Sequence, residues 1–152
     1  MLPLKTILYS TDFGRSARAA LRSACELARA LSAELVLVHV INPTAFALAT
    51  REASGAGAVA CVPAMSGAIE SARIALGKME SGILAQGLAC RIRVVLGSPA
   101  AAILQTARDE RADLIVMGAP DTSWLRRILT VSPTEVVTRT SRCPVLVVPR
   151  PE

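Results

Sequence analysis

Short β-rich runs alternate with longer helical runs along almost the whole chain, and this order constrains the fold more than any other feature. The β-rich runs lie at Ile7–Ser10, Leu35–Val40, Ile92–Leu96, Leu114–Met117 and Val145–Val148. The run Leu35–Val40 is apolar at nearly every position, as expected for a strand covered on both faces. The order βαβαβαβαβ predicts one α/β domain with a single doubly wound parallel sheet of five strands, order 3-2-1-4-5, and right-handed crossovers.

Helical patterns fill the intervals between these strands. They run from about Ser16 to Leu31, Met65 to Gln86 and Pro99 to Glu110, and a last helix begins at Pro133 and includes Thr140. Ser16 or a residue just before it is expected to cap the first helix, and Ser98 the third. The segment Ser132-Pro133-Thr134-Glu135 is typical of a capping box. The expected buried positions are Ala17, Leu21, Ala24, Cys25, Ala28 and Leu31 in the first helix, and Val136, Val137 and Thr140 in the last.

The segment from Asn42 to Pro63 is rich in Ala, Gly and Ser and has no clear period, so it predicts a long loop. The four cysteines form no CxxC pair, which disfavours a metal site and favours free thiols in a reducing, cytoplasmic setting. Neither a targeting segment nor a membrane span is expected.

In a doubly wound sheet, ligands bind beyond the carboxyl ends of the strands, where the winding reverses. Here that crevice lies between the first and fourth strands, at Ser10–Gly14 and Met117–Ser132. The Asp12 carboxylate can accept hydrogen bonds from an adenine or ribose donor, or it can form an Asx-turn or helix cap. The helix that follows Ser132 offers free N–H groups to an anion, although Ser132 can equally serve as its cap.

The whole chain resembles the universal stress protein family. The segments on which the resemblance depends are ILYSTD at 7–12, ELVLVHV at 34–40, GSPAAAI at 97–103, ADLIVMG at 112–118 and CPVLVV at 143–148. The resemblance implies a Rossmann-like fold related to the adenine nucleotide alpha hydrolases. It also implies homodimers, usually through the last strand, here Val145, Leu146, Val147 and Val148. An exposed apolar edge strand does need a partner.

One branch of that family binds ATP through a pattern of Gly, two residues, Gly, nine residues, Gly, then Ser or Thr. The spacing is present here at Gly118, Asp121, Val131 and Ser132, but two of the glycines are replaced. The other ATP contacts of the family correspond to Thr11, Asp12, Val40 and Met117, which are compatible with adenosine.

The residues that replace the two glycines, Asp121 and Val131, disfavour the binding of a polyphosphate. Valine strongly disfavours positive φ, which a phosphate loop often needs. A carboxylate 4 Å from a phosphate charge repels it by about 4 kcal/mol at an effective dielectric of 20. Pro120 also removes one N–H donor. Arg126 and Arg127 would offset part of this if they face the crevice.

The resemblance therefore predicts a cytoplasmic stress-response regulator that acts through ligand or partner binding and is not a conventional ATP binder. The alternative is a switch of the same family that binds ATP or another adenine nucleotide with Mg²⁺. Catalysis is not expected, because His39 lies inside an apolar strand and fits a structural role better than that of a general base.

A second alternative is a basic, nucleic-acid-associated protein, because the net charge is +5. The cations of the last third of the chain are Arg126, Arg127, Arg139, Arg142 and Arg150. Nucleic acid is nevertheless disfavoured, since aromatic residues make up only 3% of the chain and elements that read bases are absent. Trp124, the only tryptophan, is expected either to anchor a partner or to pack against the last helix.

Overall fold

The computed structural model describes residues 3–54, 61–120 and 131–152, with side chains for 3–51, 63–120 and 131–152. The elements follow the predicted alternation, with one additional helix. In chain order they are β1 (Thr6–Ser10), α1 (Arg15–Leu31), β2 (Glu34–Ile41), α2 (Pro43–Ser54), α3 (Cys61–Ala85), β3 (Cys90–Leu96), α4 (Pro99–Asp109), β4 (Leu114–Gly118), α6 (Pro133–Thr140) and β5 (Val145–Val148). All pairings within these residues are parallel, and the strand order β3-β2-β1-β4-β5 confirms the prediction.

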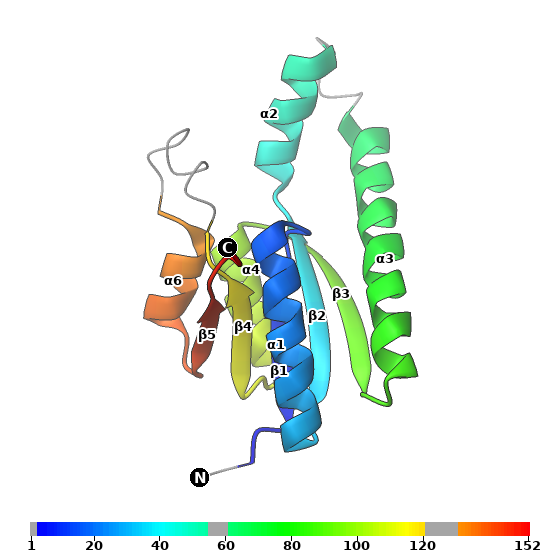
Figure 1. Cartoon of the computed structure of the whole chain (residues 1–152). Helices are drawn as coiled ribbons and strands as arrows, with labels where there is room; N and C mark the ends of the chain where they lie inside the picture. The colour runs from blue at the N-terminus through cyan, green and yellow to red at the C-terminus, as the bar shows by residue number, and fades with distance from the viewer. Residues whose placement is uncertain (1–2, 55–60, 121–130) are drawn as a thin grey trace.

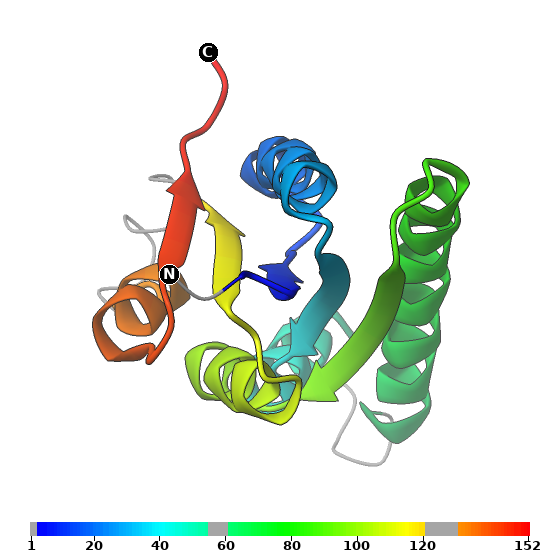
Figure 2. The same ribbon diagram turned by 90° about the horizontal axis from the view of Figure 1, so that it is seen from below.

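Helices cover both faces of the sheet, α1 and α3 on one side and α4 and α6 on the other (Figures 1 and 2). Successive strand residues point to opposite faces, so each central strand contributes to two apolar layers. In β1, Ile7 and Tyr9 pack toward α1, whereas Leu8 packs toward α4 and α6. This double burial explains why the strands are apolar at nearly every position.

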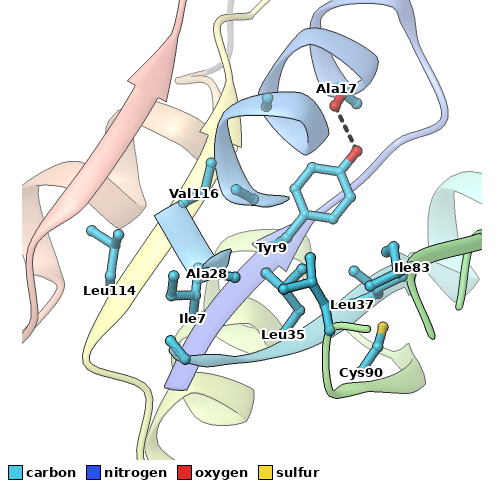
Figure 3. Packing of buried hydrophobic residues seen from close by; sticks show 14 of the residues in the cluster. Ile7, Tyr9, Ala17, Ala28, Leu35, Leu37, Ile83, Cys90, Leu114 and Val116 are labelled. Atoms are coloured by element: carbon cyan, nitrogen blue, oxygen red, sulfur yellow. Dashed lines mark hydrogen bonds between the residues drawn. The ribbon is translucent and has the colours of Figure 1, made fainter. Parts of the chain in front are cut away.

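The first turns of α1 lie very close to the sheet. Its buried residues are Ala17, Ala20, Ala24 and Ala28, whose small side chains permit the close approach. Tyr9 is 1% exposed and its hydroxyl donates a 2.6 Å hydrogen bond to the Ala17 carbonyl (Figure 3). Burial raises the pKa of Tyr9 to about 12. The apolar β1 strand is thus attached directly to the helix that follows it.

Two of the predicted buried helical positions are wrong. Leu31 is 41% exposed at the last residue of α1, and Thr140 is exposed at the last residue of α6, where Val137 is the buried residue. The N-cap of α1 is Gly14, two residues before Ser16.

The long loop predicted for 42–63 is also wrong, because Pro43–Ser54 forms helix α2 and α3 begins at Cys61. Asn42 Oδ1 accepts hydrogen bonds from the N–H groups of Thr44 and Ala45, which starts α2. Figure 1 shows α2 and the adjoining half of α3 rising beyond the carboxyl ends of the strands. Because α2 packs mainly on α3 and not on the sheet, it needs no strong apolar stripe, and the sequence shows none.

Candidate functional site

The predicted crevice lies where β1 and β4, neighbours in the sheet, reach their carboxyl ends. Thr11 directly follows β1, is 4% exposed, and donates its N–H to the Val38 carbonyl of β2 at 3.0 Å. Gly118 ends β4, and Val40 lies near the end of β2. The adjacent strands β2, β1 and β4 therefore bring these predicted residues to one edge of the sheet.

The turn after β1 is closed by its own side chains. Thr11 Oγ1 accepts the Phe13 N–H at 2.9 Å, and Asp12 Oδ1 accepts the Gly14 N–H at 2.8 Å. The Asx-turn interpretation of Asp12 is therefore confirmed. The Asp12 side chain is nevertheless exposed, and its role as a ligand acceptor stays a prediction.

Gly118 has a packing role that the sequence did not indicate. A Cβ placed on it would lie 2.6 Å from the carbonyl carbon of Ser16 and 2.8 Å from the backbone nitrogen of Ala17. The first turn of α1 therefore crosses β4 at a distance that only glycine allows. Together with the Tyr9 hydrogen bond to Ala17, this contact sets where α1 begins relative to the crevice.

Ser132 is 3% exposed, and its hydroxyl accepts the Glu135 N–H at 3.2 Å, so the predicted cap of α6 is confirmed. The preceding Val131 is 59% exposed. The exposed valine side chain stands where the family pattern has glycine, which has no side chain.

The remaining predicted site residues differ in accessibility. Met117 is 6% exposed and packs in the layer under α4 and α6, so its side chain is largely committed to the core. Val40 is half-buried at the edge of the same layer. Asp121, Trp124, Arg126 and Arg127 lie outside the described residues.

Two residues at this edge were missed as site residues by sequence reasoning, His39 and Phe13. The Nδ1 atom of His39 lies 2.8 Å from the Thr11 carbonyl oxygen, and its ring centroid lies 4.5 Å from that of Phe13. The period of two along β2 places His39 on the same face as Leu35 and Leu37. This alternation predicts on which face of the sheet the His39 ring lies, but nothing in the sequence indicated its contact with Thr11.

Two grooves in the described part of the chain lie away from this crevice. One, about 420 Å³, runs between β3 and α4, beside Glu110, which forms ion pairs with Arg91 and Arg93. The other, about 710 Å³, lies at the amino ends of the strands, next to Lys5 and Arg29. Neither is lined by Thr11, Asp12, Gly118 or Ser132.

Over the described ranges, no three His, Cys, Asp or Glu side chains are grouped so that they could hold a metal ion. In the same ranges, no helix is long and apolar enough to cross a membrane. Arg139, one of the cations considered for nucleic acid, is paired with Glu135 at 3.0 Å along α6.

Comparison with known proteins agrees with the fold. Residues 3–149 match the model of the universal stress protein family. The chain is 30% identical over 148 residues to a universal stress protein of Methanocaldococcus jannaschii, covering 97% of this chain and 84% of that protein. The chain belongs to the universal stress protein family.

Two solved structures extend the comparison. A second universal stress protein of Methanocaldococcus jannaschii is 30% identical over 154 residues, covering 96% of this chain and 95% of that protein. Its solved structure superposes with a TM-score of 0.81 over 99% of each chain. A universal stress protein solved in complex with cAMP is 25% identical, with a TM-score of 0.65 over 99% of this chain and 100% of that one.

Proposed function

We propose that this universal stress protein is a non-catalytic, cytoplasmic regulator of the stress response whose site binds adenosine nucleotides mainly by their nucleoside half. A triphosphate would add little affinity over a monophosphate. The observation that supports this most is the division of the glycine pattern. Its two retained residues, Gly118 and Ser132, both have roles in the fold, whereas Val131 stands exposed where the pattern has glycine.

The nucleoside half has the groups that such a ligand needs. Asp12 presents an exposed carboxylate at the end of β1, and a carboxylate can accept hydrogen bonds from ribose hydroxyls or the adenine amino group. Val40, half-buried near the end of the neighbouring strand β2, offers apolar surface at the same edge of the sheet. The complex of a related universal stress protein with cAMP, an adenosine monophosphate, supports the same ligand class.

By the same reasoning, the part of the site that would hold the phosphates contributes less to binding than the part that would hold the nucleoside. A phosphate loop works by presenting backbone N–H groups at close range, which glycine permits. Position 131 has an exposed valine in place of glycine, and the sequence places a carboxylate at position 121. The β- and γ-phosphates of ATP would therefore find fewer donors and more negative charge than in a glycine-rich loop.

The test is a comparison of AMP with Mg-ATP by isothermal titration calorimetry. We expect dissociation constants within about threefold of each other, since the added phosphates gain little. The double variant Asp121→Gly, Val131→Gly should bind Mg-ATP at least about tenfold more tightly, with AMP unchanged. ATP binding about a hundredfold tighter than AMP in the unaltered protein would contradict the proposal.

The Asp12→Asn variant is a sharper control than alanine. Its side-chain oxygen can still accept the Gly14 N–H, so the turn is retained while the charge is lost. AMP affinity should fall about tenfold without loss of stability. Absence of any nucleotide binding by the unaltered protein would leave a module that acts through a protein partner alone.

We also propose a homodimer formed through the free edge of β5. The carbonyls of Pro144 and Val148 accept hydrogen bonds from β4, so alternation turns the backbone groups of Val145 and Val147 toward the free side. At the other edge of the sheet, Arg93 covers the Ile92 carbonyl with a 2.9 Å hydrogen bond. β5 contains no charged residue, as expected for an edge that pairs.

Light scattering coupled to gel filtration tests the dimer. The unaltered protein should have twice the 15.9 kDa mass of the chain. Val147→Pro removes the outward N–H and leaves the bonds to β4, so it should be monomeric and folded. Val147→Thr retains the N–H and should remain dimeric. A proline variant that stays dimeric would place the interface elsewhere.

A further inference from the structure

We propose that His39 is the positioning residue of the nucleoside half of the site, because it holds in place the two residues that flank Asp12. This inference rests on the proposed nucleotide site. It goes beyond it by assigning the orientation of the Asp12 carboxylate to a side chain on a different strand, 28 positions away from Thr11 along the chain.

The hydrogen bond from His39 determines its tautomer. Nδ1 lies 2.8 Å from the Thr11 carbonyl oxygen, and a carbonyl oxygen can only accept. Nδ1 therefore bears the proton and donates it. Nε2 has no hydrogen bond within the described part of the chain. The ring is thus oriented by its contact with the site loop and not by a bond to the surrounding core.

The same ring supports the residue on the other side of Asp12. The rings of Phe13 and His39 are 4.5 Å apart between centroids and tilted by 36°. Phe13 has a φ of 63°, a left-handed conformation that aromatic residues rarely adopt. Such a conformation persists only where neighbouring contacts enforce it. The stacking on His39 and the bond from the Phe13 N–H to Thr11 Oγ1 are those contacts.

Asp12 lies between these two supported residues, and its own side chain only closes the turn onto Gly14. If both contacts of His39 are lost, the bond to the Thr11 carbonyl and the packing on Phe13, then Phe13 is free to return to negative φ, and the direction of the Asp12 carboxylate changes with it. A histidine that merely fills the core would affect stability alone. A positioning histidine affects ligand affinity beyond what any loss of stability explains.

Two substitutions separate these roles. In His39→Asn, the side-chain Nδ2 occupies nearly the place of Nδ1 and can donate to the Thr11 carbonyl, whereas His39→Leu retains the bulk but has no donor. Leu35→Ala serves as a stability control, because Leu35 is fully buried on the same face of β2 but lies near the opposite end of the strand.

The first measurement is AMP affinity by calorimetry beside the free energy of unfolding. We expect His39→Leu to weaken AMP binding about tenfold and His39→Asn by no more than about threefold. Leu35→Ala should lose more stability than either and bind AMP as the unaltered protein does. An equal loss of affinity in His39→Leu and Leu35→Ala would overturn the inference.

The second measurement needs no ligand and keeps this inference distinct from the proposed function. Amide hydrogen exchange at Phe13 and Gly14 reports the two turn bonds directly. It should accelerate about tenfold in His39→Leu and little in His39→Asn. If the unaltered protein binds no AMP but this pattern holds, the proposed function fails and the positioning role stands. Unchanged exchange at both amides in His39→Leu would refute the positioning role, whatever AMP does.

Discussion

Gly118→Ala should destabilise the protein, although alanine is normally well tolerated in a strand. The added Cβ would lie 2.6 Å from the carbonyl carbon of Ser16 and 2.7 Å from its oxygen. Both atoms belong to the backbone of α1, so no side-chain rotation relieves the contact. To reach an ordinary separation of 3.4 Å, α1 must retreat from β4 by roughly 0.8 Å.

The size of the destabilisation depends on the contacts that this movement of α1 away from β4 would disturb. Tyr9 donates to the Ala17 carbonyl at 2.6 Å, and Ala17 and Ala20 are closely packed beneath the same turn. Overpacking of a close interface typically destabilises by about 1–3 kcal/mol. The φ of Gly118 is not left-handed, so the loss is steric and not conformational.

Urea unfolding followed by circular dichroism measures the effect. With a slope of about 2 kcal/mol/M, the midpoint should fall by roughly 0.5–1.5 M. Gly82→Ala is the matched control, because Gly82 lies inside helix α3 and nothing lies within 4 Å of a Cβ placed there. That variant should gain about 0.5–1 kcal/mol from helix propensity.

The two glycine substitutions are thus expected to change stability in opposite directions. If Gly118→Ala unfolds at the same or a higher urea concentration than the unaltered protein, the close approach of α1 to β4 is not a constraint. The retention of Gly118 would then have to be explained by the ligand and not by packing.

Two further predictions concern pH and the cap of α6. The pKa of Tyr9 is raised by burial from its ordinary 10.0 to about 12, and that of Cys90 from 9.0 to about 12. The unfolded chain therefore loses these protons first, so stability should be fully present below pH 9 and fall between pH 9 and 12. Tyr9→Phe should reduce the part of this fall above pH 10, and an unchanged profile would contradict the assignment. Ser132→Ala removes the acceptor of the Glu135 N–H and should destabilise by about 1 kcal/mol in urea, whereas Ser132→Thr should be nearly neutral.

The strands could be predicted to within a residue or two because burial makes the central strands β1, β2 and β4 nearly continuous apolar runs, and the edge strands β3 and β5 are still largely apolar. The same reasoning failed for α2, since a helix that leaves the sheet and packs on another helix has no such requirement. Its sequence, rich in alanine, had the propensity for a helix but no period by which to detect it.

The candidate site was predictable in outline for a topological reason. In a parallel doubly wound sheet, the alternation of elements already determines that the residues after β1 and β4 meet at one edge. Asp12, Gly118 and Ser132 could therefore be named from their places in the order of elements. The turn at Asp12 and the cap at Ser132 are local hydrogen bonds, within reach of sequence reasoning for the same reason.

The order of elements, the strand order, the central buried runs and the local hydrogen bonds at Asp12 and Ser132 were thus determined by the sequence itself, because they depend on periodicity and on neighbours a few residues apart. Only the tertiary structure decided that Gly118 lies against the backbone of α1 and that His39 supports the turn at Thr11. Both contacts join residues far apart in the chain at distances of a few ångströms. Such contacts depend on how closely a helix and a sheet approach, and no pattern along the sequence encodes that distance.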